Sequence, residues 1–264
     1  MTRQVPMSSS KPLVYLILGP AGSGRREVVA DLIEGGLAGE DRPAVLLPES
    51  EPANAADARL PNVGRWTGSD VFLTADLPEG ATHIFLVTDG RRNPVEQLEA
   101  CKAWLEISGA ELARILCLVH CRLVEQHPPL VAWFDACLHF SDVALLNRRE
   151  GVANKWLSDY VARCEKLFHP CLFEIVKAGR VKNPALVLDP QARRVSHAFD
   201  AEQDWLITAE GDEIDEQEEA EDEDEVEIAL EEDPYLVRDA TGRHAKRLPE
   251  LAKYLDPAPP ASGS

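Results

Sequence analysis

The chain has 264 residues, enough for one α/β domain of about 200 residues and an appended segment. The stretch 210–233 contains 16 acidic residues and no basic one, and without it the formal charge of −19 falls to −3. A nearly neutral body with an acidic tail disfavours a nucleic-acid partner. The apolar run Pro12 to Leu18 is far shorter than the ~20 residues of a membrane-spanning helix, so we expect no membrane insertion.

Strand-like and helix-like patterns alternate through the first two thirds of the chain. Their order predicts an α/β domain with a mainly parallel sheet and helices on both faces. The strand-like runs are Val14 to Leu18, Ala44 to Leu47, His83 to Thr88, Arg114 to His120, Val143 to Leu146 and Leu172 to Val176. The helical patterns are Arg25 to Glu34, Pro94 to Ile107, Leu130 to His139 and Ala153 to Phe168.

Composition divides the chain into four parts: a flexible N-terminus (1–12), the α/β domain (13–200), an acidic low-complexity linker (201–233) and a basic, amphipathic C-terminal segment (234–264). Repulsion between like charges predicts that the linker is disordered. In the last part, Leu248, Leu251, Ala252 and Leu255 are spaced for one short apolar face. This segment is the candidate for binding a protein partner.

The six cysteines are scattered, with no C-x-x-C pair and no secretory segment before them, which favours reduced thiols and a cytoplasmic location. Cys117 and Cys121 flank His120 on a predicted strand, where alternate residues point to opposite faces. These three side chains therefore do not converge, and we expect core packing rather than metal binding.

A glycine-rich turn, GPAGSGRR, follows the first predicted strand with the spacing of the phosphate-binding motif G-x-x-x-x-G-K-[ST]. In that motif backbone N–H groups surround phosphates, the lysine reaches the terminal phosphates and the hydroxyl residue holds Mg²⁺. Here Arg25 and Arg26 replace both functional side chains. The alternative interpretation of GPAGSGRR is an ordinary strand-to-helix turn, in which the glycines serve the backbone geometry alone. The candidate phosphate-binding residues are Gly19, Gly22, Ser23, Gly24, Arg25 and Arg26.

Several ordered segments resemble the CobW-type family of phosphate-loop GTPases and metallochaperones. They are the glycine turn, HIFLVTDGRRNPVEQLEA, FSDVALLNRREGV and LFEIVKAGRVKNPALVLD, and they cover roughly residues 13 to 189. The resemblance implies a three-layer phosphate-loop NTPase-like domain that binds GTP or another nucleotide. FSDVALLNRREGV is similar to the family's guanine-recognition element, which makes Asn147 and Glu150 the candidate base-binding residues.

The chain keeps the loop glycines and Asn147 but departs from the family at most of the positions that carry chemistry. The glutamate of the family's second metal-binding motif falls at Val87, which leaves Asp89 as the nearest carboxylate and the only catalytic candidate. Glu150 replaces the aspartate that recognises guanine. The family's thiolate motif is missing, and Trp66 lies about where its cysteines would be. We therefore assign no metal site, and the altered phosphate-binding motif leaves open whether Mg²⁺ binds with the nucleotide.

Arginines also flank the second motif, at Arg91 and Arg92, and these join the two loop arginines as candidates for an anion site. The first hypothesis is a divergent, CobW-like, GTP-binding protein with weak or lost GTPase activity that senses a nucleotide or binds a partner. The second is an active GTP-hydrolysing metal chaperone. The third is a non-enzymatic interaction module that uses the acidic tail.

Overall fold

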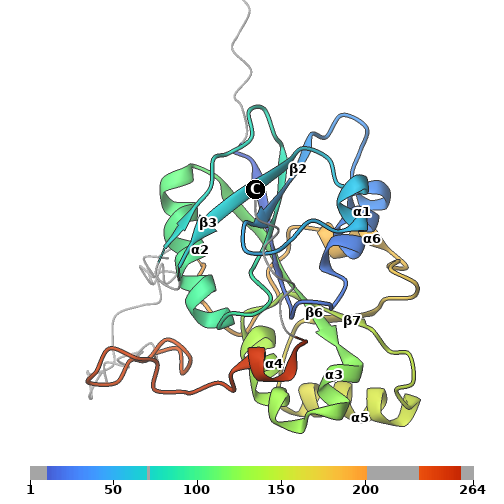
Figure 1. The fold of residues 1–264 in the computed structure, drawn as a ribbon, viewed down its shortest axis with the longest axis vertical. Helices are drawn as coiled ribbons and strands as arrows, with labels where there is room; N and C mark the ends of the chain where they lie inside the picture. The colour runs from blue at the N-terminus through green and yellow to red at the C-terminus, as the bar shows by residue number, and fades with distance from the viewer. Residues whose placement is uncertain (1–10, 70–71, 201–231, 257–264) are drawn as a thin grey trace, which may run out of the picture.

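The fold is built around an eight-stranded sheet, seen in the computed structural model of residues 11–69, 72–200 and 232–256 (Figure 1). The strand order is β4-β3-β2-β5-β1-β6-β7-β8, and all neighbours are parallel except β3 and β4. The predicted mainly parallel sheet is confirmed. The strands are β1 Leu13–Leu18, β2 Pro43–Pro48, β3 Val63–Gly68, β4 Leu73–Thr74, β5 His83–Val87, β6 Glu111–His120, β7 Val143–Asn147 and β8 Leu172–Ile175.

Helices cover both faces of this sheet, which makes three layers. Alternate residues of β1 divide between the faces: Val14 and Leu16 join one apolar core, and Tyr15 and Ile17 join the other. Residues of α1 and α6 belong to the second core, and those of α2, α3, α4 and α5 belong to the first. The helices are α1 Arg25–Gly36, α2 Pro94–Ser108, α3 Cys121–Gln126, α4 Val131–His139, α5 Asn154–Lys166 and α6 Pro184–Leu188, with short 3₁₀ helices η1 Ala55–Arg59, η2 Pro128–Leu130 and η3 Leu251–Tyr254.

Local sequence signals explain where α2 begins and ends. The side chain of Asn93 accepts a hydrogen bond from the Val95 N–H at 3.0 Å, and Pro94 occupies the first helical position. Gly109 then ends the helix with a φ of 73°. The four predicted helices and six predicted strands are present, with bounds that differ by a few residues.

Two strands and two short helices, β3, β4, α3 and α6, are not predicted. Of the six residues of β3 only Trp66 is buried, so the strand has no apolar alternation for a sequence pattern to reveal. Its carbonyl and N–H groups nevertheless pair with β2 and β4 near the sheet edge. Cys121 is also placed differently from the prediction, because β6 ends at His120 and Cys121 begins α3.

The C-terminal segment 232–256 packs on the α2 and α4 side of the domain, where Figure 1 shows it beside α4. Tyr235 and Leu251 are buried in the same core as α4, whereas Ala252 is exposed and does not belong to an apolar face. Asp233 accepts a hydrogen bond from His139 Nε2 at 2.8 Å. Residues 1–10 of the predicted flexible N-terminus (1–12) and residues 201–231 of the predicted acidic linker (201–233) lie outside the described residues, so the domain divisions stay predictions.

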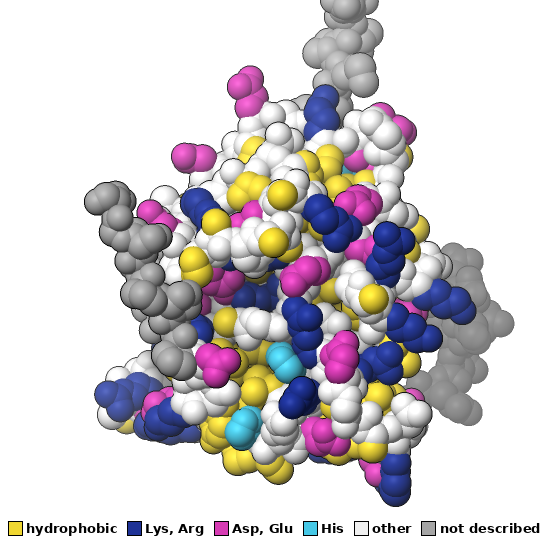
Figure 2. Space-filling model, turned by 45° about the vertical axis from the view of Figure 1, so that its right-hand side comes forward, with side chains coloured by type: hydrophobic (Ala, Val, Ile, Leu, Met, Phe, Trp, Pro, Cys, Tyr) yellow, Lys and Arg dark blue, Asp and Glu magenta, His cyan; other side chains and the backbone are white. Residues whose placement is uncertain are grey.

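The surface of the described part carries charges of both signs. Figure 2 shows lysine and arginine side chains interspersed with aspartate and glutamate over the face that it presents, with histidine side chains among them. This mixture agrees with the small formal charge that remains when the acidic stretch is set aside. No helix in the described residues is both long enough and apolar enough to cross a membrane.

Candidate functional site

The candidate residues meet at the carboxyl ends of the central strands. In the strand order, β5 and β2 lie on one side of β1, and β6 lies on the other side of β1. In parallel α/β sheets, such a reversal leaves a crevice at the carboxyl ends of the strands, where ligands bind. The glycine loop follows β1, Asp89 follows β5 and Asn147 ends β7. The fold therefore brings together motifs that are far apart in the sequence.

The glycine loop adopts a backbone that its glycines permit. Gly24 is the N-cap of α1 with a φ of 88°, and a Cβ there would lie 2.5 Å from Asn147 Nδ2. Gly19 has a φ of 137°, and its Cβ would lie 2.8 Å from the Leu118 carbonyl oxygen. No side chain caps the helix at Gly24. The first N–H groups of α1 have no partner inside the helix, so they can face an anion.

Two residues of the β7 end hold this loop from outside. Asn147 donates from Nδ2 to the Ser23 carbonyl oxygen at 2.8 Å, and Arg148 donates from Nε to the Gly22 carbonyl oxygen at 3.0 Å. Arg148 also pairs with Glu27 at 3.1 Å. Glu150 lies exposed beyond them. The amide group of Asn147 is thus used to shape the loop, and base recognition by Asn147 and Glu150 stays a prediction.

The two loop arginines are buried and paired with carboxylates of the β2–β3 connection. Arg25 and Arg26 are each 4% exposed. Arg25 forms an ion pair with Glu51 and a hydrogen bond to the Thr88 carbonyl oxygen. Arg26 pairs with Glu51 at 3.1 Å and with Asp57 at 2.8 Å. Two guanidinium charges therefore face two carboxylate charges, whereas the sequence alone suggested that both were available to an incoming anion.

Glu51 and Asp57 are the site residues that sequence reasoning missed. A signal for them was present, because charged side chains are almost never buried without a partner. Arg25 and Arg26 follow a buried strand and begin a helix with a buried face, so each required a carboxylate nearby. The acidic sequence Glu49 to Glu51, directly after another strand, was the available source.

Asp89 is enclosed by donors from its own loop and from the β2 end. Its carboxylate accepts hydrogen bonds from Ser50 Oγ at 2.8 Å and from the Arg91 N–H at 2.9 Å, and it pairs with Arg92 Nε at 3.2 Å. No group of three His, Cys, Asp or Glu side chains among the described residues is arranged to hold a metal ion. The role of Asp89 as a metal or water contact stays a prediction.

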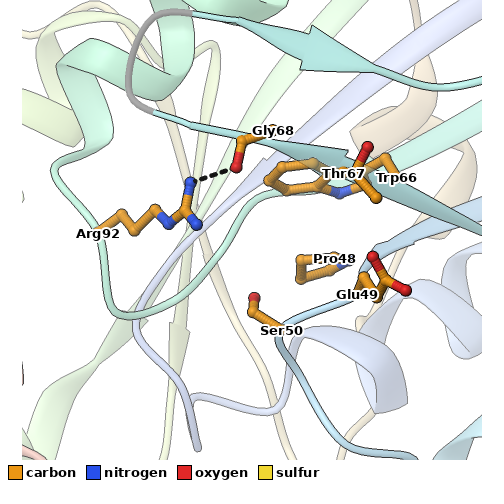
Figure 3. Close-up of a pocket in the computed structure, with 7 residues that line it drawn as sticks. All are labelled: Pro48, Glu49, Ser50, Trp66, Thr67, Gly68 and Arg92. Atoms are coloured by element: carbon orange, nitrogen blue, oxygen red, sulfur yellow. Dashed lines mark hydrogen bonds between the residues drawn. The ribbon is translucent and has the colours of Figure 1, made fainter.

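The four arginines of the predicted anion site surround the same end of the sheet, but they differ in what they bind. Within residues 11–69, 72–200 and 232–256, the Arg91 guanidinium group donates to one acceptor, the Asp256 carbonyl oxygen, at 2.6 Å. Arg92 donates to the Gly68 carbonyl oxygen at 2.9 Å in addition to pairing with Asp89 (Figure 3). Arg91 is therefore the member of the four whose charge has no carboxylate partner among the described residues.

Three of the cavities in the described part open beside these residues, and one of about 220 Å³ is lined by Arg26, Glu51, Asp89 and Arg91. Of the other two, the larger, of about 510 Å³, is lined by Ala21 and Gly22 of the loop, by Arg91 and by Tyr254 of the C-terminal segment. The second, of about 300 Å³, is the hollow in Figure 3, where Arg92 lies across from Glu49 and the Trp66 ring forms part of the wall. Trp66 donates from Nε1 to the Val87 carbonyl oxygen at 2.8 Å and so links the end of β3 to the end of β5, across the intervening β2.

His120 lines the larger cavity at the end of β6. Its Nδ1 accepts a hydrogen bond from the Leu123 N–H at 3.2 Å, which caps α3. Burial lowers the pKa of His120 because the charged imidazolium is poorly solvated there. A neutral ring at pH 7 supplies no positive charge to an anion, so the basic character of this cavity comes from Arg91 and Arg122.

The cysteines lie in the protein interior. All six are free and buried. Burial raises the pKa of Cys101, Cys121 and Cys171 to about 12, because an apolar environment disfavours the thiolate. These thiols therefore pack in the core.

Comparisons with known proteins give two solved structures as examples. The zinc-bound YjiA GTPase from E. coli is 11% identical, with a TM-score of 0.41, over 70% of this chain and 67% of that chain. A zinc-bound triple mutant of YjiA GTPase is 14% identical, with the same score and the same coverage of both chains. No protein-family model matches the chain, and no curated protein is significantly similar in sequence.

Proposed function

We propose that this protein binds a phosphate group of a nucleotide at the loop Gly19 to Arg26, and that it is a nucleotide-sensing or partner-binding protein rather than an efficient GTPase. The observation that carries the proposal is the shape of the loop. Its backbone is held by Asn147 and Arg148, and it leads into an uncapped helix whose first N–H groups favour an anion. The CobW-like motifs make GTP and GDP the first nucleotides to test.

Weak or lost hydrolysis follows from the partners of the loop arginines. Phosphoryl transfer depends on positioning and on charge neutralisation by a lysine and Mg²⁺. Arg25 occupies the lysine position and Arg26 the position of the hydroxyl that holds Mg²⁺, and both guanidinium groups bind protein carboxylates instead. An arginine also cannot ligate a cation. We therefore expect phosphate release at about the rate of the buffer alone.

The C-terminal segment offers a place where ligand binding can be sensed. It lines the same cavity as Ala21 and Gly22, and it is tied to the loop region by the bond between Arg91 and the Asp256 carbonyl. Its apolar residues Tyr235 and Leu251 are buried against the domain itself. A protein partner that used these side chains would have to release the segment first.

The test is a calorimetric titration of the full chain with GTP, GDP and ATP, each with and without Mg²⁺. We expect measurable binding of at least one nucleotide and loss of that binding in Gly24→Ala, whose Cβ would meet Asn147 Nδ2 at 2.5 Å. The control is Gly39→Ala, because a Cβ at Gly39 has no neighbour within 4 Å. Absence of heat with every nucleotide would overturn the proposal, and sustained phosphate release would overturn the loss of hydrolysis.

A further inference from the structure

Glu51 lies where the two loop arginines point. Its carboxylate pairs with Arg25 and, at 3.1 Å, with Arg26, and it accepts a hydrogen bond from the Gly90 N–H at 3.1 Å. Two guanidinium groups and a backbone N–H are the donors that proteins commonly present to a phosphate group. The side chain is 13% exposed, so it is largely removed from water. The chain thus supplies its own anion to these donors.

The charges around Glu51 hold it in its ionised form. Burial raises the pKa of Glu51. Arg25, the Gly90 N–H and Arg26 together lower it by more, so the net pKa lies below the ordinary value. Asp57 accepts two hydrogen bonds from Arg26, at 2.8 and 2.9 Å, and so completes the neutralisation. A second anion arriving at the arginines would have to displace a carboxylate that is already well bound.

The phosphate-loop motif divides its contacts between inner and outer parts of a nucleotide. Backbone N–H groups surround the inner phosphates, the lysine reaches the terminal phosphates and the hydroxyl residue holds Mg²⁺. In this chain the backbone of the loop keeps its shape, whereas the side chains at the other two positions are committed to Glu51 and Asp57. The Ala21 and Ser23 N–H groups donate to the carbonyl oxygens of Gly90 and Pro20. The inner contacts therefore fall to the N–H groups of Gly22, Gly24 and the first turn of α1, whereas the outer ones are filled by the protein's own carboxylates.

We infer that Glu51 takes the place of the terminal phosphate and that Arg26 takes the place of the metal-binding hydroxyl, so that the loop accepts a phosphate compound with one or two phosphate groups and no divalent cation. The inference rests on the proposed function, because it concerns the same loop, and it specifies the class of ligand. Glu51 is a specificity-determining residue in this account: its carboxylate repels a third phosphate and leaves the inner positions open.

The first arm of the experiment uses the unaltered full chain. Its affinities for GMP, GDP and GTP are measured by calorimetry in EDTA and again in Mg²⁺. We expect GMP or GDP to bind at least as tightly as GTP, with affinities that Mg²⁺ leaves unchanged. Tighter binding of GTP with Mg²⁺ than of GDP in EDTA, by tenfold or more, would overturn the inference while the proposed function stands.

The second arm uses Glu51→Gln, which keeps the size of the side chain and removes its charge. We expect its affinity for GTP to rise by roughly tenfold, equivalent to about 1.4 kcal/mol, because two guanidinium groups lose a competing anion. Glu49→Gln is the matched control: Glu49 belongs to the same connection but lines the separate hollow of Figure 3. An unchanged or weaker affinity for GTP in folded Glu51→Gln would overturn the inference.

The two arms distinguish failure of the inference about Glu51 from failure of the proposed function. If neither the unaltered chain nor Glu51→Gln binds GMP, GDP, GTP or inorganic phosphate, the proposed function itself is wrong. If Glu51→Gln does not fold, the metal dependence and the order of affinities in the unaltered chain still decide the question. Asp57→Asn then serves as a second variant, since of the two loop arginines Asp57 pairs with Arg26 and not with Arg25, and we expect a smaller gain in affinity for GTP. An unchanged or weaker affinity in folded Asp57→Asn would overturn the inference.

Discussion

Asn147 donates a hydrogen bond from its side-chain nitrogen to the carbonyl oxygen of Ser23 at 2.8 Å, across 124 positions of sequence. The bond connects the end of β7 to the middle of the glycine loop, and both groups are buried. The asparagine that the sequence marks as a base contact is therefore also a support for the phosphate loop.

Changing Asn147→Asp should destabilise the protein. The substitution keeps the size of the side chain but turns a carboxylate toward the Ser23 carbonyl, which leaves a buried acceptor unpaired at a cost of about 1–3 kcal/mol. Urea unfolding measures the change in the free energy of unfolding. The control is Asn62→Asp, because Asn62 Nδ2 donates to the Pro43 carbonyl oxygen at 2.9 Å in an exposed position. Equal losses in the two variants would contradict the structural role of Asn147.

Adding one methyl group at Gly90 should disturb the glycine loop at Ala21, away from the Asn147 contact. A Cβ there would lie 2.3 Å from the Ala21 nitrogen, in a place where Ala21 donates a hydrogen bond to the Gly90 carbonyl oxygen at 2.8 Å. We expect Gly90→Ala to lower the free energy of unfolding by about 1–3 kcal/mol, as overpacking does elsewhere. Thermal melting compares it with Gly39→Ala, which should melt as the unaltered chain does. A melting temperature for Gly90→Ala equal to that control would show that the contact is loose.

The sequence predicts the central sheet well because its strands are buried on both faces. Runs such as Val14 to Leu18 are continuously apolar, and the turn after them has glycines at fixed spacing. It does not predict β3, the strand beside the edge strand β4, since Trp66 is its single buried residue. Periodicity arises from burial, so a strand that buries one side chain leaves no periodic signal.

The candidate site was predictable in its location but not in its charge balance. The glycine spacing and Asn147 identify the end of the sheet at which a ligand would bind. The partners of Arg25 and Arg26 depend on how the connection after β2 folds back, and Glu51 and Asp57 lie there without any motif. Two buried arginines indicate that carboxylates lie nearby. Which carboxylates pair with them depends on the tertiary structure, which neither motif spacing nor local propensity specifies.

The attachment of the C-terminal segment should weaken in acid. Burial raises the pKa of Asp233. Its hydrogen bonds from His139 and Ser196 lower the pKa by more, so the net value lies below the ordinary 3.8. Stability from a lowered carboxyl pKa is present above the unfolded pKa and is lost as the pH falls through the folded pKa. The difference in unfolding free energy between the unaltered chain and Asp233→Asn should therefore shrink below about pH 4.

Urea unfolding from pH 7 to pH 3 measures that difference. Asp159→Asn provides the control, because Asp159 pairs with Lys155 on the exposed surface of α5. Surface pairs of this kind contribute little, so the control should show no comparable pH dependence. A difference for Asp233→Asn that stays constant through pH 3 would mean that its carboxylate does not hold the segment.

The cysteines should be inert in the folded protein. Burial raises the pKa of Cys164 to about 11 and that of Cys101 to about 12, so almost no thiolate is present at pH 8. A colorimetric thiol reagent at pH 8 should react with none of the six thiols before unfolding and with all six in denaturant. Rapid reaction of one thiol in the native protein would identify an exposed cysteine and contradict the packing of the core.

The most direct test of the account is to observe which backbone N–H groups respond when a phosphate compound binds. Amide resonances of the ¹⁵N-labelled full chain can be followed while GDP is added in EDTA. If the loop binds the phosphates as proposed, the resonances of Gly22, Gly24 and Arg25 shift first and saturate together, without any divalent cation. Shifts that require Mg²⁺, or that leave these three amides unchanged while others move, would contradict it.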